Sequence, residues 1–203
     1  MEIYIVRHGE TIWNKEHRLQ GRTNIPLSEY GRALARQTGI ALRDTYIDQI
    51  YSSPLDRAYE TACLLRGERD IEIQKDERII ELNFGSLEGQ VMEDLKARPE
   101  TTFEHFFEHP ELYQADERGE SLEELCARAT AFMREEIEPR ENQWERVVIV
   151  AHGAMNKALM AHVKGHGIKD FWSGGLQKNC NVMIIQLKNG KYSIIDEEKI
   201  FYE

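Results

Sequence analysis

Short apolar runs alternate with amphipathic segments along this chain. Residues 2–6 (Glu-Ile-Tyr-Ile-Val) and residues 146–151 (Arg-Val-Val-Ile-Val-Ala) are rich in β-branched side chains, and this pattern predicts two buried strands. Further strands are predicted at residues 48–52, 71–73, 181–187 and 191–198. The last two flank Asn189-Gly190, a dipeptide that favours a tight turn, so they predict a β-hairpin.

Between the strands, apolar residues recur at helical spacing. Ser28 and Ser121 are typical helix N-caps, and Glu124 completes a capping box with Ser121. We expect the helix after Ser121 to run to about residue 137 and another helix to span residues 156–163. Ser53-Pro54 predicts another helix start, with serine as the N-cap and proline at the first helical position. Strands separated by helices favour an α/β three-layer sandwich with a mainly parallel central sheet, one antiparallel edge strand and helices on both faces.

The pattern weakens between about residues 90 and 119, where Pro99 and Pro110 interrupt it. We expect helical pieces there that form a small lid over the sheet, as an insertion in a single domain spanning residues 1–203. Aromatic side chains gather in and beside this stretch, at Phe103, Phe106, Phe107 and Tyr113. They would either contact a bound ligand or pack the lid onto the sheet.

Composition narrows the class of protein. A length of 203 residues suits one α/β domain, and a formal net charge of −10 argues against nucleic acid or an anionic membrane as a partner. We find no leader-like segment and no run apolar enough to cross a bilayer, so we expect a cytoplasmic protein. The cysteines, Cys63, Cys126 and Cys180, suggest reduced core residues rather than a metal site. The oligomeric state is open, with a homodimer as one option.

Three predicted strands lead into charged residues. His8 with Arg7 follows the first strand, Arg57 lies in the opening turn of the helix after the second, and His152 follows the strand at 146–151. Ligands of parallel sheets bind at the carboxyl ends of the strands, so these side chains should share one crevice. Transfer of a phosphoryl group through nitrogen needs a neutral imidazole, cationic donors and an acid, and Glu81 is the natural acid. Such a set requires no metal ion and no cofactor.

The motifs around these residues resemble those of the histidine phosphatase superfamily, in its phosphoglycerate-mutase-like branch. They are Arg7-His8-Gly9-Glu10-Thr11 with Asn14, the stretch 19–28 with Gly31, the stretch 52–58 with Thr61-Ala62, Glu81 with Phe84-Gly85 and Glu88-Gly89, Gly119-Glu120-Ser121, and Val150-Ala151-His152-Gly153. The resemblance covers about residues 1–160, and several ordered motifs are more specific than any one of them. Asn24 stands where the family usually shows aspartate.

The resemblance implies a role for each matching residue. His8 would be the nucleophile that becomes a phosphohistidine, Arg7 and Arg57 would bind the phosphoryl group, His152 would hydrogen-bond it, and Glu81 would donate the proton. Substrate contacts would come from Asn14, Gln20, Gly21 and Arg22. The implied activity is hydrolysis of a small phosphomonoester, and the sequence does not choose between a sugar phosphate, α-ribazole phosphate and a phosphoglycerate.

Three other functions compete with phosphomonoester hydrolysis. A cofactor-dependent phosphoglycerate mutase would share the phosphohistidine step, but only about thirty residues separate Gly89 from Gly119, which is short for the family's mutases. A binding module without turnover is disfavoured because the nucleophile and the acid are both present. The stretch from His105 to His109 fits the H-x-x-E-H pattern of a zinc peptidase, and His162 and His166 have metal-ligand spacing, but Pro110 should end the first helix at His109.

Overall fold

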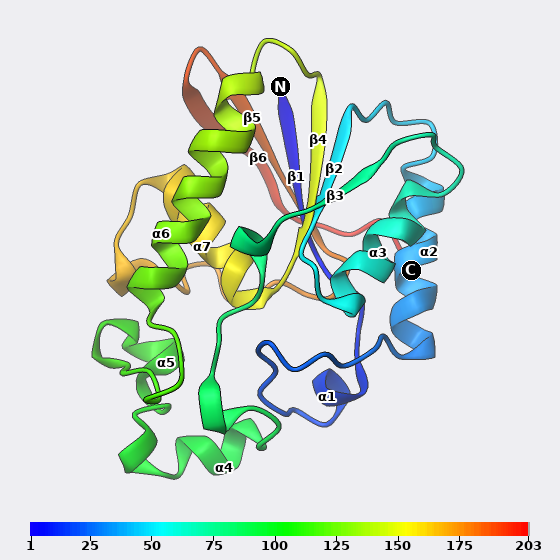
Figure 1. The fold of residues 1–203 in the computed structure, drawn as a ribbon. Helices are drawn as coiled ribbons and strands as arrows, with labels where there is room; N and C mark the ends of the chain where they lie inside the picture. Colours follow the sequence, from blue (N-terminus) through cyan, green and yellow to red (C-terminus); the bar gives the residue numbers. More distant parts are fainter. Residues whose placement is uncertain (203) are drawn as a thin grey trace.

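The computed structural model describes residues 1–202 and is built on a six-stranded sheet in the order β3-β2-β4-β1-β5-β6 (Figure 1). The strands are β1 (Glu2–Arg7), β2 (Gln49–Ser52), β3 (Ile73–Lys75), β4 (Arg146–Ala151), β5 (Val182–Lys188) and β6 (Lys191–Lys199). β3, β2, β4 and β1 run parallel, β5 is antiparallel to β1, and β6 pairs antiparallel with β5. The predicted mainly parallel sheet with a hairpin at one edge is therefore confirmed.

Helices cover both faces of the sheet. They are α1 (Ile12–Lys15), α2 (Glu29–Ala41), α3 (Asp56–Arg66), α4 (Met92–Lys96), α5 (His105–Glu108), α6 (Leu122–Phe132) and α7 (Gly153–Lys164). Figure 1 shows α2 and α3 on one side of the sheet and α6 and α7 on the other. Within the part of the chain that the model describes, no helix is both long and apolar enough to cross a membrane.

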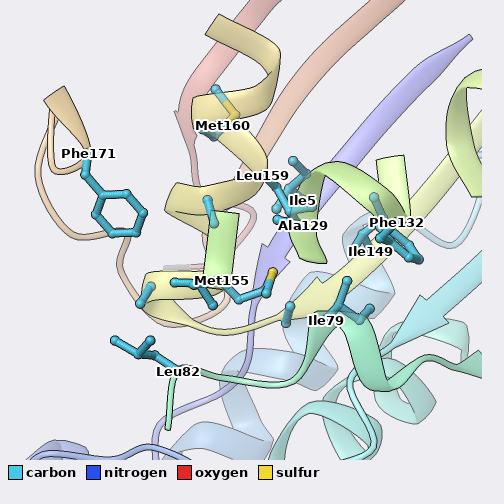
Figure 2. Close-up of a cluster of buried hydrophobic side chains, with 14 of the residues drawn as sticks. Ile5, Ile79, Leu82, Ala129, Phe132, Ile149, Met155, Leu159, Met160 and Phe171 are labelled. Carbon is cyan, nitrogen blue, oxygen red and sulfur yellow. The ribbon is translucent and has the colours of Figure 1, made fainter. Parts of the chain in front are cut away.

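Alternation along the strands fills a separate core on each face. In β1, Ile3 and Ile5 join the core under α6 and α7, whereas Tyr4 and Val6 join the core under α2 and α3. Figure 2 shows the first of these cores, in which Phe132 and Leu159 pack over the sheet. This is the physical reason for the three-layer sandwich, since both sheet faces are apolar and both must be covered.

Several element boundaries differ from those that the sequence pattern predicts. The third strand starts at Ile73 rather than residue 71, because its register pairs Ile73 with Ile50. α7 starts at Gly153, directly after the extended residue His152, and not at residue 156. The predicted helix to about residue 137 is α-helical only to Phe132 and continues as a π turn, η5 (Met133–Ile137).

The predicted start of a helix at Ser53-Pro54 is wrong. α3 begins at Asp56, and its N-cap is Leu55, which makes no side-chain cap. The Ser53 hydroxyl lies 2.7 Å from Nε2 of His152 and also accepts from the N–H of Leu55 at 3.4 Å. Arg57 still falls in the first turn of α3, as the sequence predicted.

The segment 90–119 consists of short helical pieces, as expected. It contains α4, α5 and two 3₁₀ turns, η3 (Pro99–Thr101) and η4 (Pro110–Leu112). Other 3₁₀ turns are η1 (Glu77–Ile79), η2 (Gly85–Leu87), η6 (Glu138–Arg140) and η7 (Ile168–Asp170). Figure 1 places α4 and α5 below the sheet, at the same end as α1.

The fully buried Phe132 offers a test of the larger core. Its ring stacks edge-on with Tyr51, with ring centroids 5.3 Å apart, so removing it leaves a cavity. We expect Phe132→Ala to lower the free energy of unfolding by about 3–5 kcal/mol in urea denaturation. The exposed Ile40 is the control, and Ile40→Ala should change the free energy of unfolding by less than about 0.5 kcal/mol. Equal effects of the two substitutions would contradict this view of the core.

Candidate active site

The register of the parallel strands brings the predicted site residues to one edge of the sheet. Arg7 at the end of β1 pairs with Ala151 at the end of β4, and Ser52 at the end of β2 pairs with Val150. The residues that follow these strand ends therefore meet, and the rings of His8 and His152 lie 5.2 Å apart between centroids. The sequence-based expectation of one shared crevice is met for both histidines.

His8 is buried, and its ring is held in one tautomer. Nδ1 lies 2.7 Å from the carbonyl oxygen of Gly9, which can only accept, so Nδ1 carries the proton and Nε2 keeps a lone pair. Burial and the positive charges of Arg57 and Arg7 lower the pKa of His8 well below its usual value. At neutral pH this imidazole is uncharged, which is the state that a nitrogen nucleophile requires.

The guanidinium groups of Arg57, which is fully buried, and of Arg7, which is half-buried, donate to main-chain carbonyls. Arg7 donates to the Gln177 oxygen at 2.5 Å, and Arg57 donates to the oxygens of Gly21 at 2.6 Å and Thr23 at 2.9 Å. Nε of each arginine is buried without a partner, and within residues 1–202 neither guanidinium forms an ion pair. Burial lowers the pKa of Arg57 to about 10, so the group stays charged near neutral pH.

His152 lies against the second strand end. Its Nε2 is 2.7 Å from the Ser53 hydroxyl, while its buried Nδ1 has no partner in the described chain. Burial and the charge of Arg57 lower the pKa of His152 well below its usual value, so this imidazole is neutral too. Sequence reasoning missed the contact of Ser53, because a serine before a proline reads as a helix cap.

Glu81 lies on a loop after η1, and its carboxylate is bound by main-chain N–H groups. Oε1 accepts from Met155 at 3.0 Å and from Leu82 at 2.9 Å, and Oε2 accepts from Ala154 at 3.2 Å. Two of these donors belong to the first turn of α7, where the helix dipole favours a negative group. Burial nevertheless outweighs these contacts and raises the pKa of Glu81, which makes the group a better acid near neutral pH.

The residues expected to bind substrate divide into two pairs. Asn14 and Gln20 line a cavity together with His8. Gly21 and Arg22 are not among the residues that line this cavity. The Gly21 carbonyl accepts a hydrogen bond from Arg57, and the Arg22 guanidinium donates to the Glu81 carbonyl at 3.2 Å.

The cavity beside His8 has a volume of about 70 Å³. Its inner end is polar, and its outer wall is apolar and comes partly from the segment 90–119. The wall residues are Leu19, Phe84, Met92, Phe106, Phe107, Trp172 and Leu176, and Arg18 also contributes. Phe106 and Phe107 thus face the site, whereas Phe103 is part of the core behind them. Trp172 and Leu176 were missed because they lie beyond the region that carries the motifs.

A model of the histidine phosphatase superfamily (branch 1) matches residues 3–197 of this chain. The chain belongs to this family. Phosphoserine phosphatase 1 of Hydrogenobacter thermophilus is 32% identical over 98% of this chain and 88% of the relative. The solved structure of Bacillus stearothermophilus YhfR is 34% identical, covers 100% of this chain and 99% of its own, and superposes with a TM-score of 0.89.

Some relatives of this histidine phosphatase carry mutase names. The 2,3-bisphosphoglycerate-dependent phosphoglycerate mutase of Cytophaga hutchinsonii is 32% identical over 80% of this chain and 76% of the relative. The phosphatase-named relative above matches a larger share of both chains. The chain is an enzyme of the phosphomonoesterase type.

The metal-site alternative finds no support in the geometry of this phosphatase. α5 ends at Glu108, so His109 lies beyond the helix that a zinc peptidase motif would need, as Pro110 predicted. His162 instead contacts Glu138 at 2.7 Å, and His166 is half-buried, with its Nδ1 3.4 Å from the Gly167 oxygen. In the chain up to residue 202, no three His, Cys, Asp or Glu side chains are grouped to hold a metal ion.

Gly21 tests the loop that holds Arg57 in this phosphatase. A Cβ at this position would collide with the Glu88 carboxylate and the Leu82 carbonyl, so the loop must move. We expect Gly21→Ala to lower the free energy of unfolding by about 1–3 kcal/mol and to reduce the rate of phosphate release. Gly167→Ala is the control, since its Cβ would meet nothing within 4 Å. An unchanged Gly21→Ala enzyme would show that the loop position does not matter.

Proposed function

We propose that this enzyme hydrolyses a small phosphomonoester in two steps through a phosphohistidine on His8. In the first step Nε2 of His8 attacks phosphorus, the ester P–O bond breaks, and Glu81 protonates the leaving oxygen. In the second step water attacks phosphorus, Glu81 takes the proton from this water, and the N–P bond breaks. Inorganic phosphate leaves, and His8 returns to its neutral state.

The observation that carries the proposal is that Arg57, which is fully buried, and Arg7, which is half-buried, have no carboxylate partner within the described residues. A buried charge is costly unless it is paired, and the unpartnered Nε of Arg7 and Arg57 leaves donors unused beside the neutral His8. A phosphoryl group supplies both the negative charge and the oxygens that these donors need. His152, with its free Nδ1, would add a further contact to the same oxygens.

Hydrolysis is favoured over mutase chemistry by the outer wall of the cavity. A mutase must retain a second phosphorylated species while it turns, which needs several cationic contacts beyond the first phosphoryl site. The wall here is mostly apolar, and Arg18 is its one basic side chain among the described lining residues outside the catalytic set. We propose that the segment 90–119 acts as a lid over this wall.

A cytoplasmic location and the oligomeric state stay predictions of the sequence.

His8→Ala tests the nucleophile and the reaction class together. We expect it to abolish phosphate release from p-nitrophenyl phosphate while urea denaturation shows an intact fold, because the residue supplies the attacking nitrogen. Arg57→Ala should lower kcat by about 10²–10³, as the loss of a transition-state donor does. Release of phosphate by His8→Ala at the wild-type rate would overturn the mechanism. Rapid interconversion of 2- and 3-phosphoglycerate with a bisphosphate primer and little free phosphate would favour the mutase.

The opposite pKa shifts of His8 and Glu81 predict a pH profile. The rate rises as pH passes the pKa of His8, which burial lowers, and falls as pH passes the pKa of Glu81, which burial raises. The optimum of kcat/KM should therefore be acidic. With phenyl phosphate as the substrate, Glu81→Gln should remove the basic limb and lower kcat/KM by about 100-fold or more. A wild-type rate that climbs through pH about 6.5, the ordinary histidine range, would contradict the shift of His8.

A further inference from the structure

The segment that carries Glu81 is held by side chains rather than by a sheet or helix. It follows η1, and the carbonyl oxygens of residues 78, 80 and 81 all accept hydrogen bonds from Arg128 on α6. The distances are 2.8 Å from Nη1 to the oxygen of Arg78, 2.5 Å from Nη1 to that of Ile80, and 3.1 Å from Nη2 to that of Glu81. One planar guanidinium therefore fixes the path of this segment.

Glu120 holds the Arg128 guanidinium from its other side. Oε1 accepts from Nε of Arg128 at 2.6 Å, and Oε2 accepts from Nη2 at 2.8 Å, a two-point contact in which both side chains are largely buried, 16% and 12% exposed. Burial alone would raise the pKa of Glu120, but the hydrogen bonds and charge of Arg128 lower it overall. The carboxylate is thus ionised when it binds Arg128.

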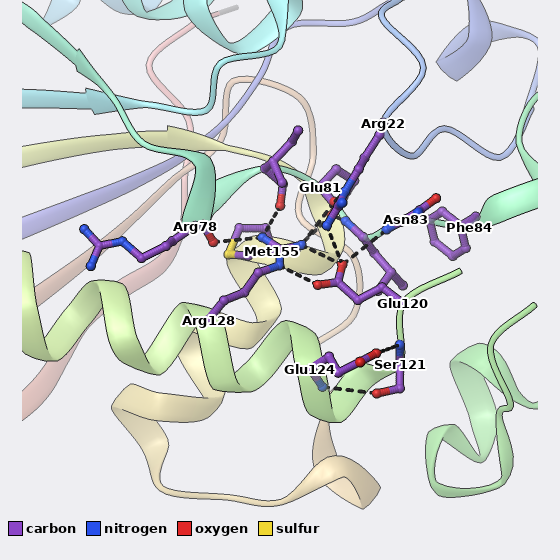
Figure 3. Close-up of polar contacts among 12 residues, drawn as sticks. Arg22, Arg78, Glu81, Asn83, Phe84, Glu120, Ser121, Glu124, Arg128 and Met155 are labelled. Atoms are coloured by element: carbon purple, nitrogen blue, oxygen red, sulfur yellow. Dashed lines mark hydrogen bonds and ion pairs between the residues drawn. The ribbon is translucent and has the colours of Figure 1, made fainter. Parts of the chain in front are cut away.

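Arg22 is a second arginine that contacts both Glu120 and the main chain of Glu81. Its Nη2 contacts Oε2 of Glu120 at 3.1 Å, and its Nε donates to the Glu81 carbonyl, which therefore accepts from two arginines. Figure 3 shows the Glu120 carboxylate between Arg22 and Arg128, with Glu81 beside Arg22. Arg22 directly follows Gly21, whose carbonyl holds Arg57.

We propose that Glu120, Arg128 and Arg22 form a clamp that positions Glu81 for proton transfer relative to the phosphoryl-binding arginines. Arg128 and Arg22 contact the main chain of Glu81, and Arg22 is joined directly to Gly21, whose carbonyl binds Arg57. The three clamp residues are therefore positioning residues. In this proposal Arg22 is not a substrate ligand. Glu120 directly follows the segment 90–119. The clamp therefore connects the C-terminal end of that segment to Glu81 through Arg128. The inference rests on the proposed role of Glu81 as the acid.

A matched pair of substrates separates acid positioning from general damage. Phenyl phosphate needs protonation of its leaving oxygen, whereas the nitrophenolate of p-nitrophenyl phosphate leaves without it. We expect Glu120→Gln and Arg128→Lys to lower kcat/KM on phenyl phosphate by about 10- to 100-fold and on p-nitrophenyl phosphate by about threefold or less, because kcat/KM reports the first step, in which the leaving group departs, and not the later attack of water that both substrates share. Arg128→Lys keeps the charge but loses the fork that spans three carbonyls.

Two reference variants complete the test. Glu60→Gln removes an ion pair of 2.6 Å with Arg32, away from Glu81, and should leave both rates unchanged. Glu81→Gln should show the strongest dependence on the leaving group. If Arg128→Lys fails to fold in urea titrations, Glu120→Gln carries the test alone.

The outcomes distinguish the two claims. Equal losses of kcat/KM on both substrates, or no loss, in Glu120→Gln beside a strong leaving-group effect in Glu81→Gln would overturn the clamp alone. The absence of a leaving-group effect in Glu81→Gln would overturn the assignment of the acid, and the clamp with it. For Arg22→Ala, a lower kcat at constant KM supports positioning, whereas a KM raised about tenfold with constant kcat would make Arg22 a substrate ligand and overturn its place in the clamp.

Discussion

A neutral imidazole held between buried positive charges is the interaction on which this site depends. His8 is kept uncharged by burial and by Arg57 and Arg7, and its tautomer is fixed by the carbonyl of Gly9. A protonated His8 would add a third positive charge to a region that already lacks a counter-anion. The same electrostatic arrangement therefore keeps the nucleophile available and prepares the site for an anionic group.

The surrounding structure keeps carboxylates away from the phosphoryl-binding arginines while still holding these arginines in place. Arg57 is bound by the carbonyls of Gly21 and Thr23, and the loop between them is fixed by Glu88, whose carboxylate accepts from the N–H groups of Arg22 and Thr23 at 2.8 Å each. The Glu88 carboxylate thus binds the main chain of the loop, and the loop's carbonyls, rather than a carboxylate, bind Arg57. Glu81 is the exception, and burial together with a raised pKa suits it to hold a proton.

Sequence patterns predicted the sheet and the meeting of His8 and His152 at one edge of it, since β1 and β4 are apolar strands and each leads into a histidine. What they missed depends on contacts between distant residues. Ser53 reads as a helix cap but contacts His152, and no sequence pattern predicts that Arg22 contacts the Glu81 carbonyl and the Glu120 carboxylate. Trp172 lines the cavity from a turn without a motif. No local pattern encodes such partners, because they are set only when the layers pack.

The central claim is most directly tested by the protonation state of the His8 ring. Nitrogen NMR on protein labelled with ¹⁵N in its histidines, with signals assigned through His8→Ala, reports the tautomer and charge of this ring as pH is lowered. The structure predicts a neutral ring with the proton on Nδ1 that stays neutral well below pH about 6.5, the ordinary histidine value. A ring that titrates near that value, or one that carries its proton on Nε2, would contradict the account.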